Sequence, residues 1–287
     1  MNIAFIGLGN MGAPMARCLI AAGHNVAGFD TALSPDDIPS ARSAVSAVEN
    51  VDVVITMLPN GDILRAVAAD IHPAMSKGAL HLDCSTVDVQ SARDVATAAI
   101  NAGLLAVDAP VSGGIGGATN GTLTFMAGGT PAAFERASPL FDVMGQEAVH
   151  CGDSGAGQAA KICNNMILGA TMIATCEAFA LADKLGLDRQ SMFDVVSSSS
   201  GYSWSMNAYC PAPGVGPQSP ADNAYTPGFS GALMLKDLRL SQQAAQSVGA
   251  QTPMGARATE LYADFVELHG MGGMDFSAML PHLSAEE

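Results

Sequence analysis

Lys161 and Asn165 are the residues whose types and spacing most directly suggest chemistry. They stand four positions apart in an apolar, alanine-rich run without proline, residues 158–181, which is typical of a long buried helix. Side chains four apart share one face of a helix, so an ammonium and an amide would meet the same ligand. A lysine in such a run often only reaches solvent or pairs with a carboxylate, and the helix pattern alone favours that structural role. The alternative is a positioned proton donor and acceptor.

A glycine-rich turn near the N-terminus predicts a dinucleotide site. Gly7, Gly9 and Gly12 follow the pattern G-x-G-x-x-G between an expected strand at residues 2–7 and an apolar helical run. In such a turn the first glycine permits the tight bend, the second lets a pyrophosphate approach the backbone, and the third lets helix and strand pack closely. A glycine turn alone is weak evidence, but here it has the strand and the helix that the motif requires. The residues between the glycines, Leu8, Asn10 and Met11, are expected to line the same site.

Asp30 indicates which dinucleotide is preferred. It ends the second expected strand, residues 24–30, and follows Gly12 by 18 positions, where a carboxylate can accept hydrogen bonds from the adenosine ribose. A carboxylate also repels a 2′-phosphate, and residues 31–41 contain no arginine. The sequence therefore predicts NAD rather than NADP.

The first half of the chain alternates between strand-like and helical segments. This alternation predicts an α/β dinucleotide-binding domain of the Rossmann type, whose ligands bind beyond the carboxyl ends of the parallel strands. Further strands are expected at residues 51–58, 79–83, 104–109, 123–127 and 148–151. The loops that deserve inspection are therefore 58–59, 84–86 and 110–117.

The last of these loops lies in a segment, residues 108–118, that reads DAPVSGGIGGA. Backbone N–H groups in such a glycine-rich loop, together with the Ser112 hydroxyl, could hold a carboxylate of the substrate. A flexible connection would show the same composition. The loop by itself leaves both possibilities open.

After Gly157 the pattern becomes helical throughout. Helices are expected at residues 188–198, 230–248, 253–269 and 276–283, with Asp188 and Ser230 as N-terminal caps. The expected organisation is a first domain at residues 1–157 and an all-α domain at 158–287, joined by the long helix that carries Lys161. Lys236 and Asp237 lie in the helix after Phe229, where an ordinary surface ion pair is the competing explanation.

Composition excludes several kinds of partner. The chain has 287 residues and a net charge of −15, which disfavours nucleic acid and anionic membranes. Six cysteines without a C-x-x-C pair and six histidines without a ligand-type spacing predict reduced thiols and no metal. The first strand begins too early for a signal peptide, and Glu177 interrupts the longest apolar run, so we expect a cytoplasmic protein without a membrane span.

Four segments and the acid Asp30 together resemble the β-hydroxyacid dehydrogenase family. The segments read GLGNMGAPMA at 7–16, DAPVSGG at 108–114, GQAAKICNN at 157–165 and FSGALMLKDL at 229–238. They occur in the family's order and cover nearly the whole chain. Within the family, residues 201–215, GYSWSMNAYCPAPGV, most resemble the 3-hydroxyisobutyrate dehydrogenase group.

The resemblance implies a role for each matching residue. It makes Lys161 the catalytic acid/base, with Asn165 orienting the substrate hydroxyl. The substrate would further contact Ser112, Gly113, Gly114, Lys236 and Asp237, with Trp204, Met206 and Tyr209 as candidates beside its methyl group. The cofactor would be lined by Leu58, Pro59, Thr86, Phe229 and Lys236 as well as by the glycine turn and Asp30.

The expected reaction is the NAD-dependent oxidation of 3-hydroxyisobutyrate to methylmalonate semialdehyde, a step of valine catabolism. Alternatives in the same family are a tartronate semialdehyde reductase or a dehydrogenase of serine or 3-hydroxypropionate, because small pockets discriminate weakly between such acids. A non-catalytic NAD-binding sensor is the alternative from another class, though it has no need of a buried lysine. The apolar second half of the long helix predicts a homodimer or homotetramer.

Overall fold

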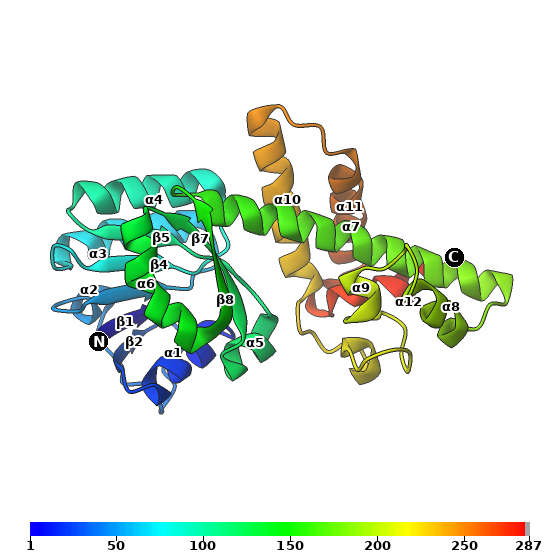
Figure 1. Cartoon of the computed structure of the whole chain (residues 1–287), viewed down its shortest axis with the longest axis horizontal. Helices are drawn as coiled ribbons and strands as arrows, with labels where there is room; N and C mark the ends of the chain where they lie inside the picture. Colours follow the sequence, from blue (N-terminus) through cyan, green and yellow to red (C-terminus); the bar gives the residue numbers. More distant parts are fainter. Residues whose placement is uncertain (285–287) are drawn as a thin grey trace. The chain divides into compact units, whose positions relative to one another are not determined.

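The computed structural model describes residues 1–284, and the chain divides into two compact units, Met1–Lys161 and Ile162–Glu287. Figure 1 shows the helices and strands of each unit. The first is an α/β unit around one sheet, and the second consists of helices, as the sequence predicted.

An eight-stranded sheet forms the centre of the first unit. Its strands are β1 (Asn2–Ile6), β2 (Asn25–Phe29), β3 (Val53–Thr56), β4 (Leu80–Asp83), β5 (Leu105–Asp108), β6 (Val111–Ser112), β7 (Leu123–Gly129) and β8 (Gly145–Gly152). The order is β2-β1-β3-β4-β5-β7-β6, with β8 paired to β7, and β1 to β5 are parallel. The chain runs from β1 to one side and then returns to place β3 on the other side. Such a reversal opens a ligand crevice at the carboxyl ends of the two strands.

Helices cover both faces of this sheet. Along β1, Ile3 and Phe5 belong to one hydrophobic cluster while Ala4 and Ile6 belong to another, because successive side chains of a strand point to opposite faces. The first cluster includes residues of α1 (Gly12–Ala21) and α6 (Pro131–Met144), and the second includes residues of α3 (Gly61–Ile71) and α4 (Val89–Asn101). The short α2 (Ala44–Ala47) and the 3-10 turn η1 (His72–Ala74) complete the second layer.

The glycine-rich segment after β5 is not the open loop that we expected at residues 110–117. Val111 and Ser112 form β6, antiparallel to β7, and Gly114–Asn120 form the helix α5. Gly113 joins them with a φ of 126°, a conformation that glycine adopts without strain. The prediction was wrong because small side chains here favour close packing: a Cβ on Gly117 would lie 3.1 Å from the Leu123 side chain.

The second unit continues α7 (Ala156–Leu185), which begins in the first unit and is longer than predicted. Among its described residues it has no strand, only an isolated bridge between Ser230 and Asp275. Its elements after α7 are α8 (Arg189–Val196), α9 (Trp204–Asn207), η2 (Pro220–Asn223), α10 (Gly231–Val248), α11 (Pro253–Ala263), η3 (Asp264–Leu268), η4 (Met271–Gly273), η5 (Phe276–Ala278) and α12 (Met279–Ser284).

The second unit has the two predicted N-terminal caps, but one predicted helix ends earlier than expected. Asp188 and Ser230 accept hydrogen bonds from the first turns of α8 and α10, as expected. The helix predicted at residues 253–269 changes type at Asp264, where a π-helical turn follows α11. Its core position Phe265 is fully buried beside Tyr262, so packing of an aromatic pair accompanies the wider turn.

By length and apolar composition alone, α7 could cross a membrane. Core helices meet the same criterion. Met172, Ile173, Cys176 and Phe179 of α7 are buried in the hydrophobic core of the second unit. We therefore interpret α7 as a core helix.

Candidate active site

The glycine turn has the geometry that a dinucleotide requires. Gly7 has a φ of 97°, and a Cβ there would lie 2.2 Å from the Met57 carbonyl oxygen at the end of β3. A Cβ on Gly12 would lie 1.9 Å from the Gly7 oxygen, so only glycine lets α1 start this close to β1. A Cβ on Gly9 would meet nothing within 4 Å. The middle glycine thus leaves open space beside the backbone at the start of a helix, where a pyrophosphate binds in such folds.

Asp30 lies at the end of β2 and is joined to the glycine turn. Its Oδ2 accepts a hydrogen bond of 2.8 Å from the Leu8 N–H, and its Oδ1 accepts from the N–H groups of Ala32 and Leu33. Burial alone would raise the pKa of this carboxyl, but the three N–H groups outweigh it and the pKa is lowered. Asp30 is therefore an ionised acceptor beside the turn.

The loop after β3, which contains Leu58 and Pro59, is attached to the loop after β4. The Leu58 N–H donates to Ser85 Oγ at 2.8 Å, and Ser85 Oγ donates to Asp83 Oδ1 at 2.6 Å. Ser85 immediately precedes Thr86. The residues expected to line the cofactor in these two loops are therefore held by one buried serine, which the sequence did not single out.

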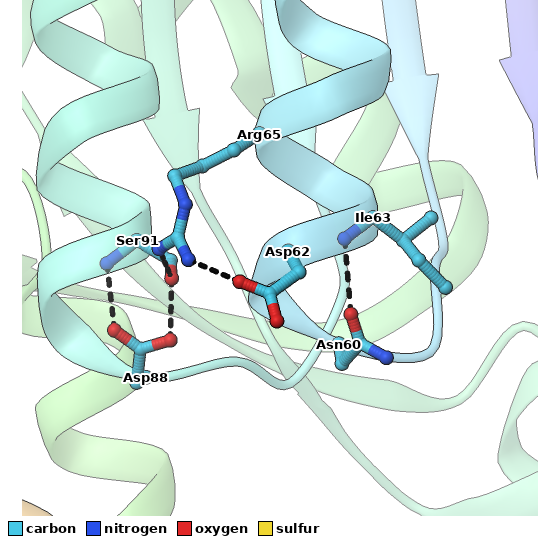
Figure 2. Close-up of polar contacts among 6 residues, drawn as sticks. All are labelled: Asn60, Asp62, Ile63, Arg65, Asp88 and Ser91. Carbon is cyan, nitrogen blue, oxygen red and sulfur yellow. Dashed lines mark hydrogen bonds and ion pairs between the residues drawn. The ribbon is translucent and has the colours of Figure 1, made fainter.

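A second set of contacts fixes the helices that follow these loops (Figure 2). Asn60 caps α3 by accepting from the Ile63 N–H at 3.0 Å, and Asp88 caps α4 by accepting from the Ser91 N–H at 2.8 Å. Arg65 of α3 donates to the Ser91 hydroxyl and pairs with Asp62. This bridge between α3 and α4 restrains both predicted cofactor loops from their helical sides.

Behind the same loops lies a buried polar network. Thr56 Oγ1 donates to Asp83 Oδ1 at 2.7 Å and therefore accepts from His81 Nε2 at 3.1 Å. The other ring nitrogen of His81 then accepts from His72 Nε2 at 2.9 Å. Burial lowers the pKa of His81 to about 3, with His72 adding to the effect, so the ring stays neutral. Burial raises the pKa of Asp83 to about 6.

Lys161 and Asn165 are both buried on α7, with 8% and 1% of their surface exposed. Within the second unit, Asn165 Nδ2 donates to Asp237 Oδ2 at 2.5 Å. The other carboxylate oxygen, Oδ1, lies 3.3 Å from Lys236 Nζ. Asp237 is only 3% exposed, so this is not the solvent-facing ion pair that was the competing explanation. The predicted residues Asn165, Asp237 and Lys236 form one connected group.

The other predicted substrate residues lie at two places. In the first unit, Ser112 and Gly114 are partly buried and Gly113 is exposed at the junction of β6 and α5. In the second unit, Trp204 is 52% exposed and its ring stacks on Tyr209 with centroids 4.8 Å apart. Met206 is 2% exposed and belongs to the hydrophobic core of the second unit.

Asp275 organises this aromatic region, although no sequence signal identified it. It is fully buried, and its Oδ2 accepts from the Tyr209 hydroxyl at 2.8 Å and from the Phe229 N–H at 3.1 Å. The Tyr209 ring stacks on Phe276, which also contacts Phe229. The C-terminal segment thus fixes the position of Phe229, a predicted cofactor residue, just before α10.

One group of side chains in the described part of the chain could hold a metal ion. Asp264 Oδ2 lies 3.5 Å from Nε2 of both His269 and His282, and all three side chains are partly exposed. The sequence predicted no metal, because these residues lack a ligand-type spacing. Exposed carboxylate and imidazole pairs need no ion to approach each other, and nothing else among residues 1–284 indicates one here.

Two family models match successive parts of the chain. Residues 2–152 match the NAD-binding domain of 6-phosphogluconate dehydrogenase. Residues 155–283 match a model described as the NAD-binding part of NADP-dependent 3-hydroxyisobutyrate dehydrogenase. The first unit is therefore an NAD-binding domain, and the second description names NADP as well as NAD.

Individual relatives match over almost their full length. The chain is 48% identical to a probable 3-hydroxyisobutyrate dehydrogenase of Mycobacterium bovis, covering 99% of this chain and 98% of the relative. It is 45% identical to an NAD-dependent L-serine dehydrogenase of Pseudomonas aeruginosa, covering 97% and 96%. A structure of the Mycobacterium tuberculosis 3-hydroxyisobutyrate dehydrogenase with L-serine has 47% identity and a TM-score of 0.94, covering 99% of each chain. By these matches and its four sequence motifs, the chain belongs to the β-hydroxyacid dehydrogenase family.

Proposed function

We propose that this protein oxidises 3-hydroxyisobutyrate to methylmalonate semialdehyde with NAD, as a step of valine catabolism. The observation that carries the proposal is the buried pair Lys161 and Asn165 on one face of α7, on a chain whose relatives are named for this reaction. A non-catalytic sensor would gain nothing from enclosing a lysine, because burial of an ammonium costs free energy.

The cofactor site supports NAD over NADP. The turn at Gly7, Gly9 and Gly12 would hold the pyrophosphate, and Asp30 would accept hydrogen bonds from the adenosine ribose while repelling a 2′-phosphate. Leu58, Pro59 and Thr86 would line the nicotinamide half. A nicotinamide held there would supply the acceptor for the hydride that leaves the carbon bearing the substrate hydroxyl.

Lys161 moves the proton. Its amine takes the hydroxyl proton at Nζ as the hydride leaves, at a position where only 8% of the lysine surface is exposed. Asn165 orients the hydroxyl, and its own amide is fixed by the hydrogen bond to Asp237. Lys236, paired with Asp237, supplies a positive charge for the substrate.

The other end of the substrate needs a carboxylate site and an apolar site. Ser112 and the N–H groups of Gly113 and Gly114, at the junction of β6 and α5, would hold the carboxylate. The exposed Trp204 ring, held against Tyr209, offers an apolar surface to the methyl group.

L-Serine is the second candidate substrate. It carries an ammonium where 3-hydroxyisobutyrate has a methyl group, and one relative is named for its oxidation. Tartronate semialdehyde and 3-hydroxypropionate are further alternatives within the same chemistry.

The deciding experiment measures NADH formation at alkaline pH with 3-hydroxyisobutyrate, L-serine, 3-hydroxypropionate and glycerate, first with NAD and then with NADP. The highest kcat/KM is expected for 3-hydroxyisobutyrate with NAD. A higher value for serine would replace the substrate and keep the mechanism. Binding of NADH without turnover of any acid would favour the sensor.

We also propose that the protein is a cytoplasmic homodimer or homotetramer. Ile167, Leu181 and Leu185 of α7 are 60–74% exposed, and their spacing of 14 and 4 residues places them along one face of the helix. An apolar stripe of this kind gains stability by packing against a second copy.

A further inference from the structure

Asp108, the last residue of β5, contacts the first turn of α7. Its Oδ1 accepts a hydrogen bond of 2.6 Å from the Gly155 N–H, and its Oδ2 accepts one of 3.0 Å from the Gln158 N–H. Asp108 is only 4% exposed. The first N–H groups of a helix have no partner within it, so a carboxylate from another element here caps the helix that carries Lys161.

Gln158 attaches the same turn to the loop after β4. Its side chain is fully buried. Its Oε1 accepts from the Val87 N–H at 3.1 Å, and its Nε2 donates to the backbone carbonyl oxygen of Ser85 at 2.8 Å. Both ends of the amide are therefore used. Because Ser85 and Val87 flank Thr86, one side chain links the start of α7 to a predicted cofactor loop.

Close backbone contacts leave this turn little freedom to shift. A Cβ on Gly157 would lie 2.2 Å from the Met126 oxygen and 2.6 Å from the Asp108 oxygen. A Cβ on Gly128 would lie 2.8 Å from the nitrogens of Ala156 and Gly157. Glycine at both positions allows the helix to start directly against β5 and β7.

We propose that Asp108 and Gln158 are positioning residues that set where Lys161 Nζ stands, an inference that rests on the proposed role of Lys161 as acid/base. Lys161 follows Gln158 by three residues, so it lies on the next turn of a helix whose start is held by four hydrogen bonds, two to Asp108 and two made by the Gln158 side chain. Asp108 holds this turn with a carboxylate whose ionisation costs free energy in a buried position. Burial raises the pKa of Asp108 to about 7, with Asp83 adding to this and the two N–H groups opposing it. A carboxylate kept at such a cost is better explained by a required geometry than by packing alone.

The test compares Asp108→Asn and Gln158→Glu with the wild type at pH 8. Asparagine keeps one acceptor but turns an NH2 group toward a backbone N–H, and glutamate keeps the contact with Val87 while losing the donor to Ser85. Each variant should lower kcat about 10- to 100-fold, as misplacement by about 1 Å does, while KM for NAD changes less than about twofold. Asp188→Ala removes a capping carboxylate from α8, which carries no predicted site residue, and serves as the control.

A second readout does not depend on turnover. The rate at which acetic anhydride modifies Lys161, followed by mass spectrometry from pH 7 to 11, reports its surroundings directly. If Asp108 and Gln158 position Lys161, the pH dependence of its modification rate should shift in both variants and stay unchanged in Asp188→Ala. Wild-type profiles in both variants, or an unchanged kcat in stable protein, would overturn the proposal. If the wild type oxidises none of the four acids, the proposed function fails while the labelling profile still decides the positioning role.

Discussion

Among individual residues, two buried aspartates lie next to each other: Asp83 and Asp108 are register partners at the ends of the adjacent strands β4 and β5. Burial raises the pKa of both carboxyls, to about 6 and about 7, although each accepts hydrogen bonds. An unfolded aspartate titrates near 3.9, so between pH 4 and 7 the folded protein binds more protons. That difference stabilises the fold fully below about pH 4, and the stabilisation is lost as the pH rises through 7.

The first prediction follows from this sign. Asp108→Asn cannot titrate, so the free energy of unfolding of the wild type relative to this variant should fall steadily from pH 4.5 to pH 8. Urea denaturation at several pH values measures it, and the difference cancels opposing groups such as His81, whose pKa is lowered. A relative stability that rises over this range would show that folding lowers the pKa of Asp108, and a constant one would show that folding leaves it unchanged.

The second prediction concerns proton transfer. Lys161→Ala should lower kcat by about 10²- to 10⁴-fold, the contribution of a positioned acid or base, while the Kd for NADH is retained. Lys184→Ala, in the last turn of the same helix, is the matched control and should keep normal turnover. Near-normal kcat in Lys161→Ala would remove the lysine from the mechanism.

The third prediction concerns cofactor choice. Asp30→Ala removes an ionised acceptor and should weaken NAD binding by about 10- to 100-fold, the worth of hydrogen bonds to a charged group, while NADP gains relative to NAD. The exposed Asp36 gives a control substitution, Asp36→Ala, at a similar distance from the turn in sequence. Unchanged selectivity in Asp30→Ala would disprove the ribose assignment.

At the scale of elements, different glycines of the turn between β1 and α1 serve folding and cofactor binding. Gly12 has no room for a Cβ because α1 begins against Gly7, whereas Gly9 borders open space. Two glycines of one motif therefore do different work, although the sequence pattern treats them alike.

The fourth prediction uses that contrast. Gly12→Ala should lower the melting temperature markedly, because the Gly7 oxygen must move. Gly9→Ala should fold with nearly normal stability and lose affinity for NADH. Thermal denaturation and fluorescence titration of both variants measure this, and equal stability losses would contradict the packing described for Gly12.

Elements with a strong period were predictable from sequence, and those with local exceptions were not. The strands β1 to β5, the helix α7 and the capped helices α8 and α10 follow from buried runs and cap residues. The prediction of a loop at residues 110–117 was wrong because a two-residue strand has no period and glycine suggests a loop. The π-helical turn at Asp264 accompanies the packing of Phe265 against Tyr262, which no local pattern reveals. Ser85, Asp108 and Asp275 act through partners 27 to 66 positions away, and no local pattern contains such pairings.

At the scale of the whole molecule, the packing within each unit does not explain why α7 carries exposed apolar side chains. Ile167, Leu181 and Leu185 form a stripe on a helix whose opposite face is core. Self-association would remove that stripe from water.

The fifth prediction tests this. Leu181→Glu places a charge in the stripe and should shift the protein to a smaller species in light scattering coupled to size-exclusion chromatography. Val248→Glu, at an apolar position at the end of α10 that is 77% exposed against 60% for Leu181, should leave the mass unchanged. A wild-type protein that is monomeric at micromolar concentration would contradict the proposed homodimer or homotetramer.

The uninterrupted course of α7 also limits how this chain can change in length during evolution. Lys161 closes one unit and Asn165 belongs to the next, yet both project from one face only while the helix between them keeps its count of residues. One residue inserted between them would rotate Asn165 by about 100° about the helix axis relative to Lys161. We therefore expect homologous chains to gain and lose residues in surface turns, and to keep the spacing of four positions between Lys161 and Asn165.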